Sequence, residues 1–321
     1  MKLMYPERHG APTASSADAN YPVANLIDDR RKKVWKAASI VRIATLRVPI
    51  SANSEAISVH ATNAWTVVCA ITLDSVEVQL TDGQPAVNLG GGLTKIPASG
   101  HGLSEGDIAV VNGTDYYDGV HTLPSQAGAA PDAPNNFVIT ATYNAETFSN
   151  TDIVCKVIES TTHTLDDGIK LYAYDRFWQE YTKQVAAHTA TIILTAGVGE
   201  TVEAGIVRAG MVVDLPSPLV GLGEGREDFS IKKQLNNGAW YIRKRDIVRS
   251  FGLSAVMDRA TEFADFTAIY EHYGPNPLCF LLVEDSNELL WAFFGHMLNP
   301  FSSSHGHPSD VDVTVDLMEA V

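Results

Sequence analysis

Short runs of alternating apolar and polar residues dominate this chain. Between residues 40 and 70, four such runs are rich in β-branched side chains, namely 40–43, 44–48, 56–61 and 65–70. The pattern resumes later, at 169–174, 191–195 and 202–213. A period of two with β-branched residues favours strands, and short strands separated by turn residues are typical of a sandwich or barrel. The sequence therefore predicts a β-sandwich and not a βαβ fold.

The chain changes character between residues 77 and 160. The pairs Asn112-Gly113 and Asp118-Gly119 lie between strand-like runs, and such pairs tolerate the positive φ angles of tight turns. Residues 125–134 combine Ala, Pro and Gly and predict an exposed loop. We interpret this stretch as a small β-barrel module inserted into the sandwich. The sandwich would then be discontinuous and would comprise residues 1–76 and 161–225.

Residues 226–321 predict an α+β domain. The stretch 240–253 predicts a long strand or hairpin, and 258–273 predicts a helix because its aromatic and aliphatic residues recur at three- and four-residue steps: Phe263, Phe266, Ile269, Tyr270 and Tyr273. Apolar or alternating runs predict three further strands, at 278–283, 289–294 and 311–317. The whole chain is expected to be mainly β: a split jelly-roll β-sandwich, an inserted small β-barrel module and a C-terminal α+β domain with one helix.

Charge and cysteine content narrow the class of protein. The formal net charge of −15 creates a field that repels a phosphate backbone, so nucleic-acid binding is disfavoured. The three cysteines are far apart and lack metal-ligand spacing, so we expect buried free thiols, no metal and no cofactor. The N-terminus lacks the apolar region of a signal peptide, and no apolar run approaches the roughly 20 residues that cross a bilayer. We expect a soluble protein that is made in the cytoplasm.

Three short motifs contain residue types used in catalysis or metal binding. His305 and His307 lie near Asp310, but the serines and proline around them favour a solvated loop. The glycines at 221–225 resemble a phosphate-binding loop, yet neither a helix nor a GK[ST] motif follows, and we interpret them as a hinge. The acidic pair at 166–167 precedes a glycine and predicts a turn. No catalytic residue is predicted, and the sequence favours a protein that is not an enzyme.

A polar motif near the N-terminus is a candidate cation or sugar site, because two aspartates and an arginine precede a tryptophan. A turn with surface charges and one buried tryptophan explains the same residues and is favoured over a site. In the inserted module, a tyrosine is available to stack on a pyranose ring. The candidate glycan-binding residues are therefore Asp28, Asp29, Arg30, Trp35 and Tyr117.

A basic stretch stands out against the acidic chain. Arg243, Arg245 and Arg249 recur at even spacings, which places them on one exposed face of a strand. Contact with an acidic neighbouring subunit and contact with nucleic acid both fit such a face, and the subunit contact is favoured. These three arginines are the candidate interface residues, together with the loops around Pro216 and Pro308.

The N-terminal segment resembles the opening of discoidin-like (galactose-binding-like) jelly rolls found in phage virion proteins. There, the string "ASS…YPA.NLLDGR….W" leads into the first strand; here the chain reads Ala14-Ser15-Ser16, then Tyr21 to Arg30, then Val34-Trp35-Lys36. Asp29 stands where that motif has glycine. The stretch 101–121 is similar to a small β-barrel motif, "GHGLxxGDxVxxxGTxxYDGxxxV", that recurs in phage tail and fibre proteins.

The C-terminal stretch is similar to the end of distal-tail and tail-tip proteins, which also have a helix ending in glycine, two apolar strands and a closing alternating strand. Together these resemblances imply a structural component of a tailed-phage virion, in the tail tip or baseplate, that acts by assembly. The implied partners are other tail subunits, further copies of the chain in a ring, and host surface glycans. A lectin-like module for host recognition is the alternative, and a polysaccharide-degrading enzyme is less favoured.

Overall fold

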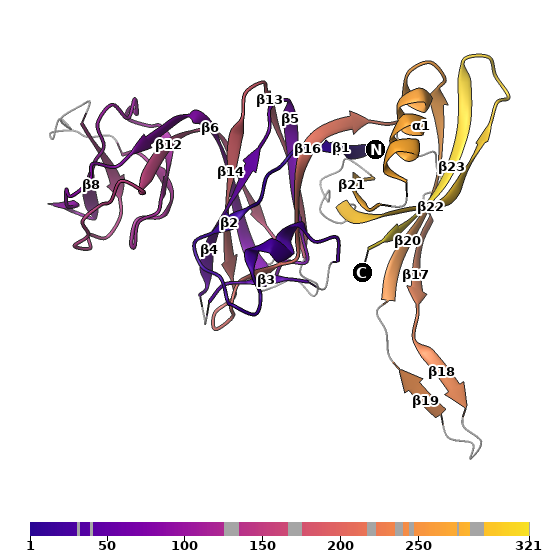
Figure 1. Ribbon diagram of the computed structural model, residues 1–321, viewed down its shortest axis with the longest axis horizontal. Coiled ribbons are helices and arrows are strands. Elements are labelled where there is room, and N and C mark those ends of the chain that lie inside the picture. Colours follow the sequence, from indigo (N-terminus) through magenta and orange to yellow (C-terminus); the bar gives the residue numbers. More distant parts are fainter. Residues whose placement is uncertain are drawn as a thin grey trace.

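The computed structural model describes residues 1–30, 33–38, 41–124, 135–165, 175–216, 223–234, 240–243, 247–274, 276–282 and 292–320. The protein is mainly β, as the sequence predicts, and the described residues contain one α-helix. Figure 1 shows the inserted module, the sandwich and the C-terminal part following one another along the long axis. The strand predicted at 169–174 and the loop predicted at 125–134 lie outside the described residues.

The sandwich consists of two antiparallel sheets. One has the order β12-β6-β14-β4-β2: Ile153–Thr164, Ala64–Gln79, His188–Ala196, Ile43–Ile50 and Thr13–Ala14. The other contains β13-β5-β16-β1: Arg176–Gln184, Ser54–His60, Ile206–Asp214 and Lys2–Glu7. From β4 to β16, consecutive strands of the sandwich alternate between the sheets, except for β6 and β12, which pair with each other. This alternation is the connectivity of a jelly roll.

The inserted module sits at the far end of β6 and β12, which run out of the sandwich (Figure 1). Its strands are β7 (Val87–Gly90), β8 (Leu93–Pro97), β9 (Ile108–Asn112), β10 (Gly119–Thr122) and β11 (Asn136–Thr140). They form the orders β10-β9-β12-β6 and β11-β8-β7, around a core of their own that includes Ile96, Val111 and Phe137.

The predicted turn at Asn112-Gly113 follows β9. Gly113 has φ +96°, and a Cβ there would lie 3.1 Å from the Cα of Asp152, so both the backbone angle and the space require glycine.

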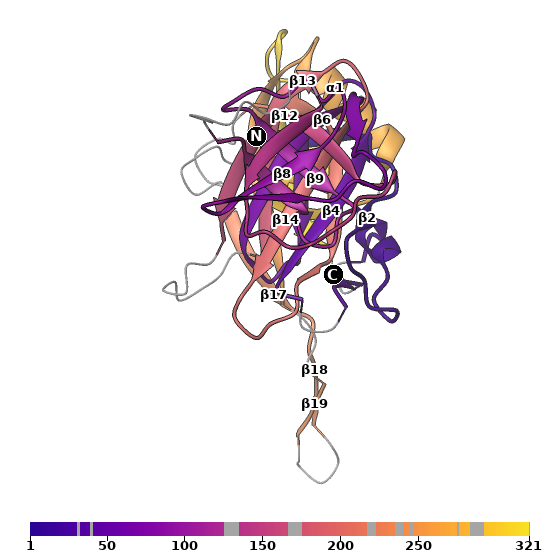
Figure 2. The same ribbon diagram turned by 90° about the vertical axis from the view of Figure 1, so that its left-hand side faces the viewer.

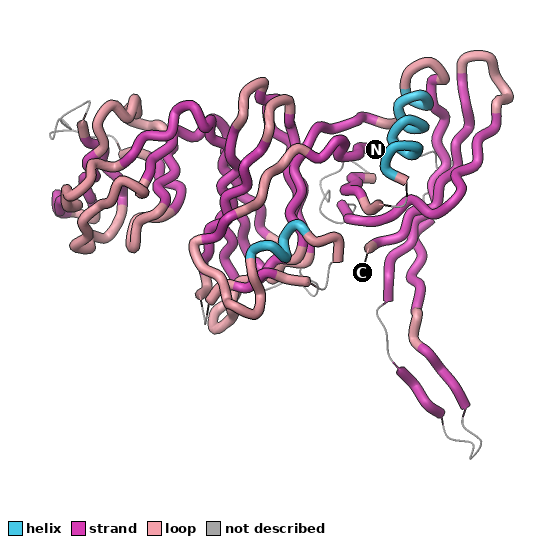
Figure 3. Tube along the Cα trace, in the orientation of Figure 1, coloured by secondary structure: helices cyan, strands magenta, loops and turns pink. Residues whose placement is uncertain are grey.

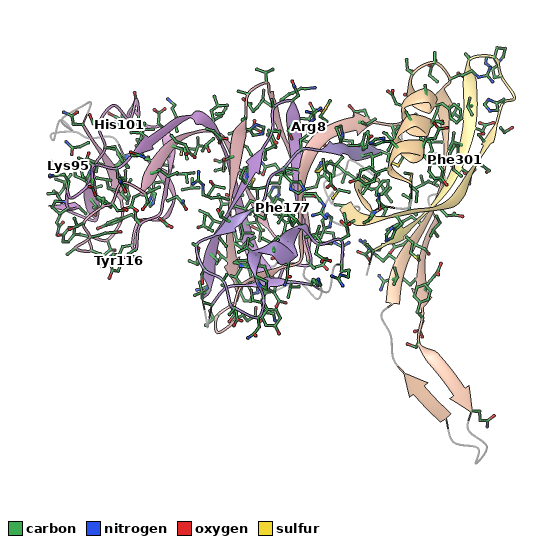
Figure 4. All side chains as sticks on the ribbon, in the orientation of Figure 1. Arg8, Lys95, His101, Tyr116, Phe177 and Phe301 are labelled. Atoms are coloured by element: carbon green, nitrogen blue, oxygen red, sulfur yellow. The ribbon has the colours of Figure 1, made fainter. Side chains whose placement is uncertain are left out.

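The C-terminal part is an antiparallel sheet with one face covered by helix α1 (Glu262–Tyr273). Its strands are β17 (Gly223–Asp228), β20 (Ile247–Asp258), β21 (Leu278–Leu281), β22 (Ala292–Ser304) and β23 (Asp310–Glu319). Alternate residues of β20 and β23 form one core with Phe266 and Ile269 of the helix. Phe301 packs edge-on against Phe266, with ring centroids 5.2 Å apart, and Figure 4 places it beside α1.

The helix starts four residues later than the sequence predicts. Asp258 is the last residue of β20, and its carboxylate accepts hydrogen bonds from the backbone N–H groups of Ala260 and Thr261. These bonds hold a turn between the strand and the helix, so the helix begins at Glu262.

The first strand connects the sandwich to the C-terminal part. β1 pairs with β16 on one side and with β21 on the other, so one nine-stranded sheet, β13-β5-β16-β1-β21-β22-β23-β20-β17, runs through both parts. Leu3 and Met4 are fully buried on its opposite faces. Met4 belongs to a separate core with Ile206, Cys279 and Phe294. Within the described residues, no helix is long and apolar enough to span a bilayer.

Candidate functional site

The N-terminal acidic motif is occupied by contacts within the chain. The carboxylate of Asp28 accepts hydrogen bonds from Arg30 Nε at 2.8 Å and from Lys33 Nζ at 2.9 Å. These two cations hold the pKa of Asp28 well below its usual range. Its charge is therefore compensated locally and not directed toward a ligand.

Asp29 fastens the turn after the short 3-10 helix η1 (Val23–Ile27) to the sandwich. Arg208 of β16 is buried, and its Nη2 lies 2.6 Å from Asp29 Oδ1. The same guanidinium donates hydrogen bonds to the carbonyl oxygens of Leu26 and Ile27, both at 3.3 Å, and its Nε lies 3.1 Å from Glu7 Oε1. The aspartate that replaces the glycine of the jelly-roll motif thus neutralises a buried arginine.

Two aromatic rings that the sequence offers for sugar stacking are closed to a ligand. Trp35 is 0% exposed, and its Nε1 donates to the carbonyl of Ser16 at 3.1 Å. Tyr117 is 1% exposed, and its hydroxyl accepts a hydrogen bond from the backbone N–H of Asn144. Both rings are core residues, which corrects their expected role in stacking. Tyr116, by contrast, is 59% exposed and lies on the outside of the module (Figure 4).

The three arginines of the basic stretch, Arg243, Arg245 and Arg249, do not share one environment. The guanidinium of Arg249 on β20 turns inward and contacts Glu319 of β23, with Nη2 3.2 Å from Oε1. The side chain of Arg249 is thus 13% exposed in this chain, which corrects the exposed face expected from strand alternation. Arg243 ends the distant strand β19, and Arg245 lies outside the described residues.

A hairpin extends from the C-terminal sheet between β17 and β20. It is formed by β18 (Ile231–Gln234) and β19 (Trp240–Arg243), whose register pairs Ile231 with Arg243 and Gln234 with Trp240. Among the described strands, these two pair only with each other. Figures 1 and 2 show the hairpin continuing from β17 and projecting away from the rest of the chain, and Figure 3 shows the same arm as a pair of strand segments. We call residues 229–246 the arm.

Sequence reasoning recognised the basic character of this region but not its shape. The pattern of residues 240–253 is compatible with one long strand or with a hairpin. The break between β19 and β20 and the distance of the arm from the body depend on tertiary structure, which residue spacing does not report.

One cluster of catalytic residue types among the described residues is buried, and the acidic pair at 166–167 lies outside the described residues. Cys279 Sγ lies 3.2 Å from Ser58 Oγ and 3.6 Å from His60 Nε2, but all three residues are buried. Burial raises the pKa of the Cys279 thiol to about 12, so the thiolate nucleophile is scarce at neutral pH. This cluster is part of the core between the sandwich and the C-terminal part.

The exposed histidines of the β22–β23 turn have different partners. His305 Nδ1 accepts a hydrogen bond from Arg259 Nη2 at 2.9 Å, whereas His307 lies 3.4 Å from Asp310. Among the described residues, no three His, Cys, Asp or Glu side chains are placed to hold a metal ion. No protein-family model matches the chain, and no curated protein matches it.

Proposed function

We propose that this chain is a structural component of a tailed-phage virion, located in the tail tip or baseplate, and that it acts by subunit assembly. The observation that carries the proposal is the arm, whose two strands pair only with each other among the described strands and project from the rest of the chain (Figures 1 and 2). A lone two-stranded hairpin is at best marginally stable in water, so it gains stability when another surface covers it. A neighbouring subunit provides such a surface.

The composition of the arm supports a protein partner. Its second strand begins with the apolar run Trp240-Tyr241-Ile242, and Phe229 at its base is 45% exposed. Aromatic residues at a projecting point are typical of the anchors that fill pockets in protein interfaces. A contact surface made by the arm would bury this run and exclude water from the hairpin.

The charge of the arm favours a further copy of the same chain as the partner. Residues 229–246 contain five Lys or Arg residues and one Asp, whereas the whole chain has a formal net charge of −15. A basic arm is therefore attracted to the acidic body of another copy, which steers association and disfavours stacking of arm on arm. Head-to-tail contacts of this kind close into a ring when the rotation between copies permits.

The likeness of three segments to phage proteins supports a location in the tail. The jelly-roll opening at 14–36, the barrel motif at 101–121 and the C-terminal element order resemble parts of tail, fibre and tail-tip proteins. The proposal assigns the chain no catalytic step. It places the protein in the virion, among other tail or baseplate subunits.

The test removes the arm while keeping the sheet. Asp228 and Ile247 are directly paired across β17 and β20, so residues 229–246 can be replaced by Asn-Gly, a sequence that favours a two-residue hairpin turn. We expect the full chain to form a defined oligomer by light scattering and native mass spectrometry. The shortened chain should be monomeric with an unchanged circular-dichroism spectrum.

Antibody labelling of purified phage particles gives the location. Label at the tip of the tail is expected. A full chain that stays monomeric at high concentration would contradict assembly through the arm, and particles without label would contradict the virion location.

A further inference from the structure

A polar pocket lies between the sandwich and the inserted module, far from the arm. Its volume is about 290 Å³. The sandwich contributes Thr13 of β2 with Thr45 and Arg47 of β4, and the turn between β9 and β10 contributes residues of the module, including Asn112 and Asp118. The pocket exists because the two parts meet here. Small-molecule pockets range from about 300 to 1,000 Å³, so this one fits a single small ring and not an extended chain.

The carboxylate of Asp118 is held by hydrogen bonds to one of its two oxygens only. Its Oδ1 accepts hydrogen bonds from the backbone N–H of Thr114 at 2.8 Å and from the Thr114 hydroxyl at 3.0 Å. Its Oδ2 has no hydrogen-bond partner among the described residues. The side-chain amide of Asn112 and the hydroxyl of Thr13, which also line the pocket, are equally without a partner in the described chain. The pocket therefore offers an acceptor, an amide that both donates and accepts, and a hydroxyl.

The charges around the pocket select against anions. Arg47 forms an ion pair with Glu77, so its charge is compensated, while Asp115 and Asp118 line the pocket as carboxylates. A phosphate, sulfate or uronic acid would meet two negative groups with no free cation beside them. A bare cation is also disfavoured, because no group of three metal-binding side chains is present among the described residues.

We propose that this pocket binds one neutral sugar residue. Each hydroxyl of a pyranose both donates and accepts hydrogen bonds, which matches the mixture of unused donors and acceptors supplied by Asn112, Thr13 and Asp118. The planar carboxylate and amide fix orientation, and the volume of about 290 Å³ limits the ligand to one ring. Because the lining comes from both parts, the bound sugar bridges the sandwich and the module. A terminal sugar of a host surface polysaccharide has the chemistry this site takes.

The site differs from the glycan residues that the sequence suggests. Asp28 and Trp35 belong to other elements, and Tyr117, although it lies in the same turn as Asp118, is buried; none of the three lines this pocket. The inference goes beyond assembly, since it neither uses the arm nor needs an oligomer.

The experiment measures binding to the purified full chain by saturation-transfer difference NMR and by calorimetry. The probes are glucose, galactose, mannose, rhamnose and N-acetylglucosamine, with glucuronate as an anionic control. We expect at least one neutral sugar to bind and glucuronate not to bind. Asp118→Asn keeps the shape and the acceptor for Thr114 but replaces the unused acceptor with a donor, and it should weaken binding at least tenfold.

Two further variants make the result specific. Asp82→Asn changes an exposed aspartate of the same module that does not line the pocket, and it should leave the affinity unchanged. Asn112→Ala should weaken binding as Asp118→Asn does, with thermal unfolding checked for both. Absence of binding by all five neutral sugars at about 10 mM, or equal affinity in Asp118→Asn and the full chain, would overturn the proposal. The chain that lacks the arm should bind sugar normally, so failure of assembly and failure of this site are distinguishable.

Discussion

Arg176 and Glu319 are 143 residues apart in sequence, yet Arg176 Nη1 donates to Glu319 Oε1 at 3.0 Å. Arg176 begins β13, an edge strand of the sandwich, and Glu319 ends β23 of the C-terminal part. The Nη2 group of Arg249 contacts the same carboxylate oxygen at 3.2 Å. The side chain of Glu319 is 7% exposed, so one buried carboxylate holds two arginines from different parts of the chain.

This relationship predicts that Glu319→Gln strongly destabilises the protein. The substitution removes the carboxylate that two largely buried guanidinium groups share, although Arg176 keeps its ion pair with Asp175, and breaking a buried pair in this way costs about 3–5 kcal/mol. Glu203→Gln is the matched control, because its ion pair with Lys36 is about one third exposed on both sides and such pairs contribute about 0–1 kcal/mol. Urea unfolding of both variants measures the difference. Equal free energies of unfolding for the two variants would show that Glu319 does not tie the parts together.

Arg249 and Glu319 show which features of the fold the sequence can predict and which it cannot. Alternation in β23 reports local backbone and burial, and β-branched residues in β4, β5 and β14 favour strands, so the mainly β class and most strands are predictable. Strand alternation also predicts on which face of its strand the side chain of Arg249 lies. It does not reveal that Glu319 of another strand lies on the same face. A pattern along one strand carries no information about which strand packs beside it.

Strand β1, which connects the sandwich to the C-terminal part, is not predictable from the sequence pattern for a related reason. Its apolar stretch is short and ends at Pro6, so it lacks a clear period, although Leu3 and Met4 are buried on opposite faces of the long sheet. Aromatic residues raise a similar difficulty, because the composition around Tyr116 and Tyr117 does not distinguish the exposed ring from the buried one. The pocket residues Thr13 and Asn112 are about a hundred positions apart in sequence and form no motif.

The three cysteines should be unreactive in the folded protein. Burial raises the pKa values of Cys69, Cys155 and Cys279 to about 12, and the thiolate is the reactive form. We expect no labelling by a thiol-specific reagent such as 5,5′-dithiobis(2-nitrobenzoate) at pH 8, and labelling of all three after unfolding in guanidinium. Rapid labelling of Cys279 in the native protein would instead mean that the core around Phe294 opens readily.

Association through the arm should depend on salt. If the basic arm contacts an acidic body, raising NaCl from about 0.05 to about 0.5 M screens the attraction and lowers the oligomer fraction measured by analytical ultracentrifugation. Replacing Lys232, Lys233 and Arg243 by glutamine should weaken the oligomer at low salt and flatten its dependence on salt. Lys183→Gln, which changes an exposed lysine outside the arm, is the control. An oligomer that strengthens with salt would point to an apolar contact in place of a charged one.

The stability of the protein should depend on pH through Asp118. Burial, together with the charges of Glu146 and Asp152, raises the pKa of Asp118 from 3.8 to about 6, despite the hydrogen bonds from Thr114 that favour the ionised form. Since the pKa is higher in the folded protein than in the unfolded chain, the folded state is penalised as Asp118 ionises. The penalty is absent below about pH 4, grows between pH 4 and 6, and is complete above pH 6.

Asp118→Asn removes that charge and keeps an acceptor for Thr114. It should therefore stabilise the protein at pH 8 by about 1–2 kcal/mol, less than the full pKa shift implies because the carboxyl is partly open to solvent. At pH 4 the variant and the original chain should unfold with equal free energies, while Asp82→Asn should show little difference at either pH. Urea unfolding at the two pH values tests this, and a variant less stable than the original chain at pH 8 would mean that the Asp118 carboxylate is well solvated or paired. If Asp118→Asn both stabilises the protein and abolishes sugar binding, the Asp118 carboxylate lowers the stability of the fold but is required for the ligand.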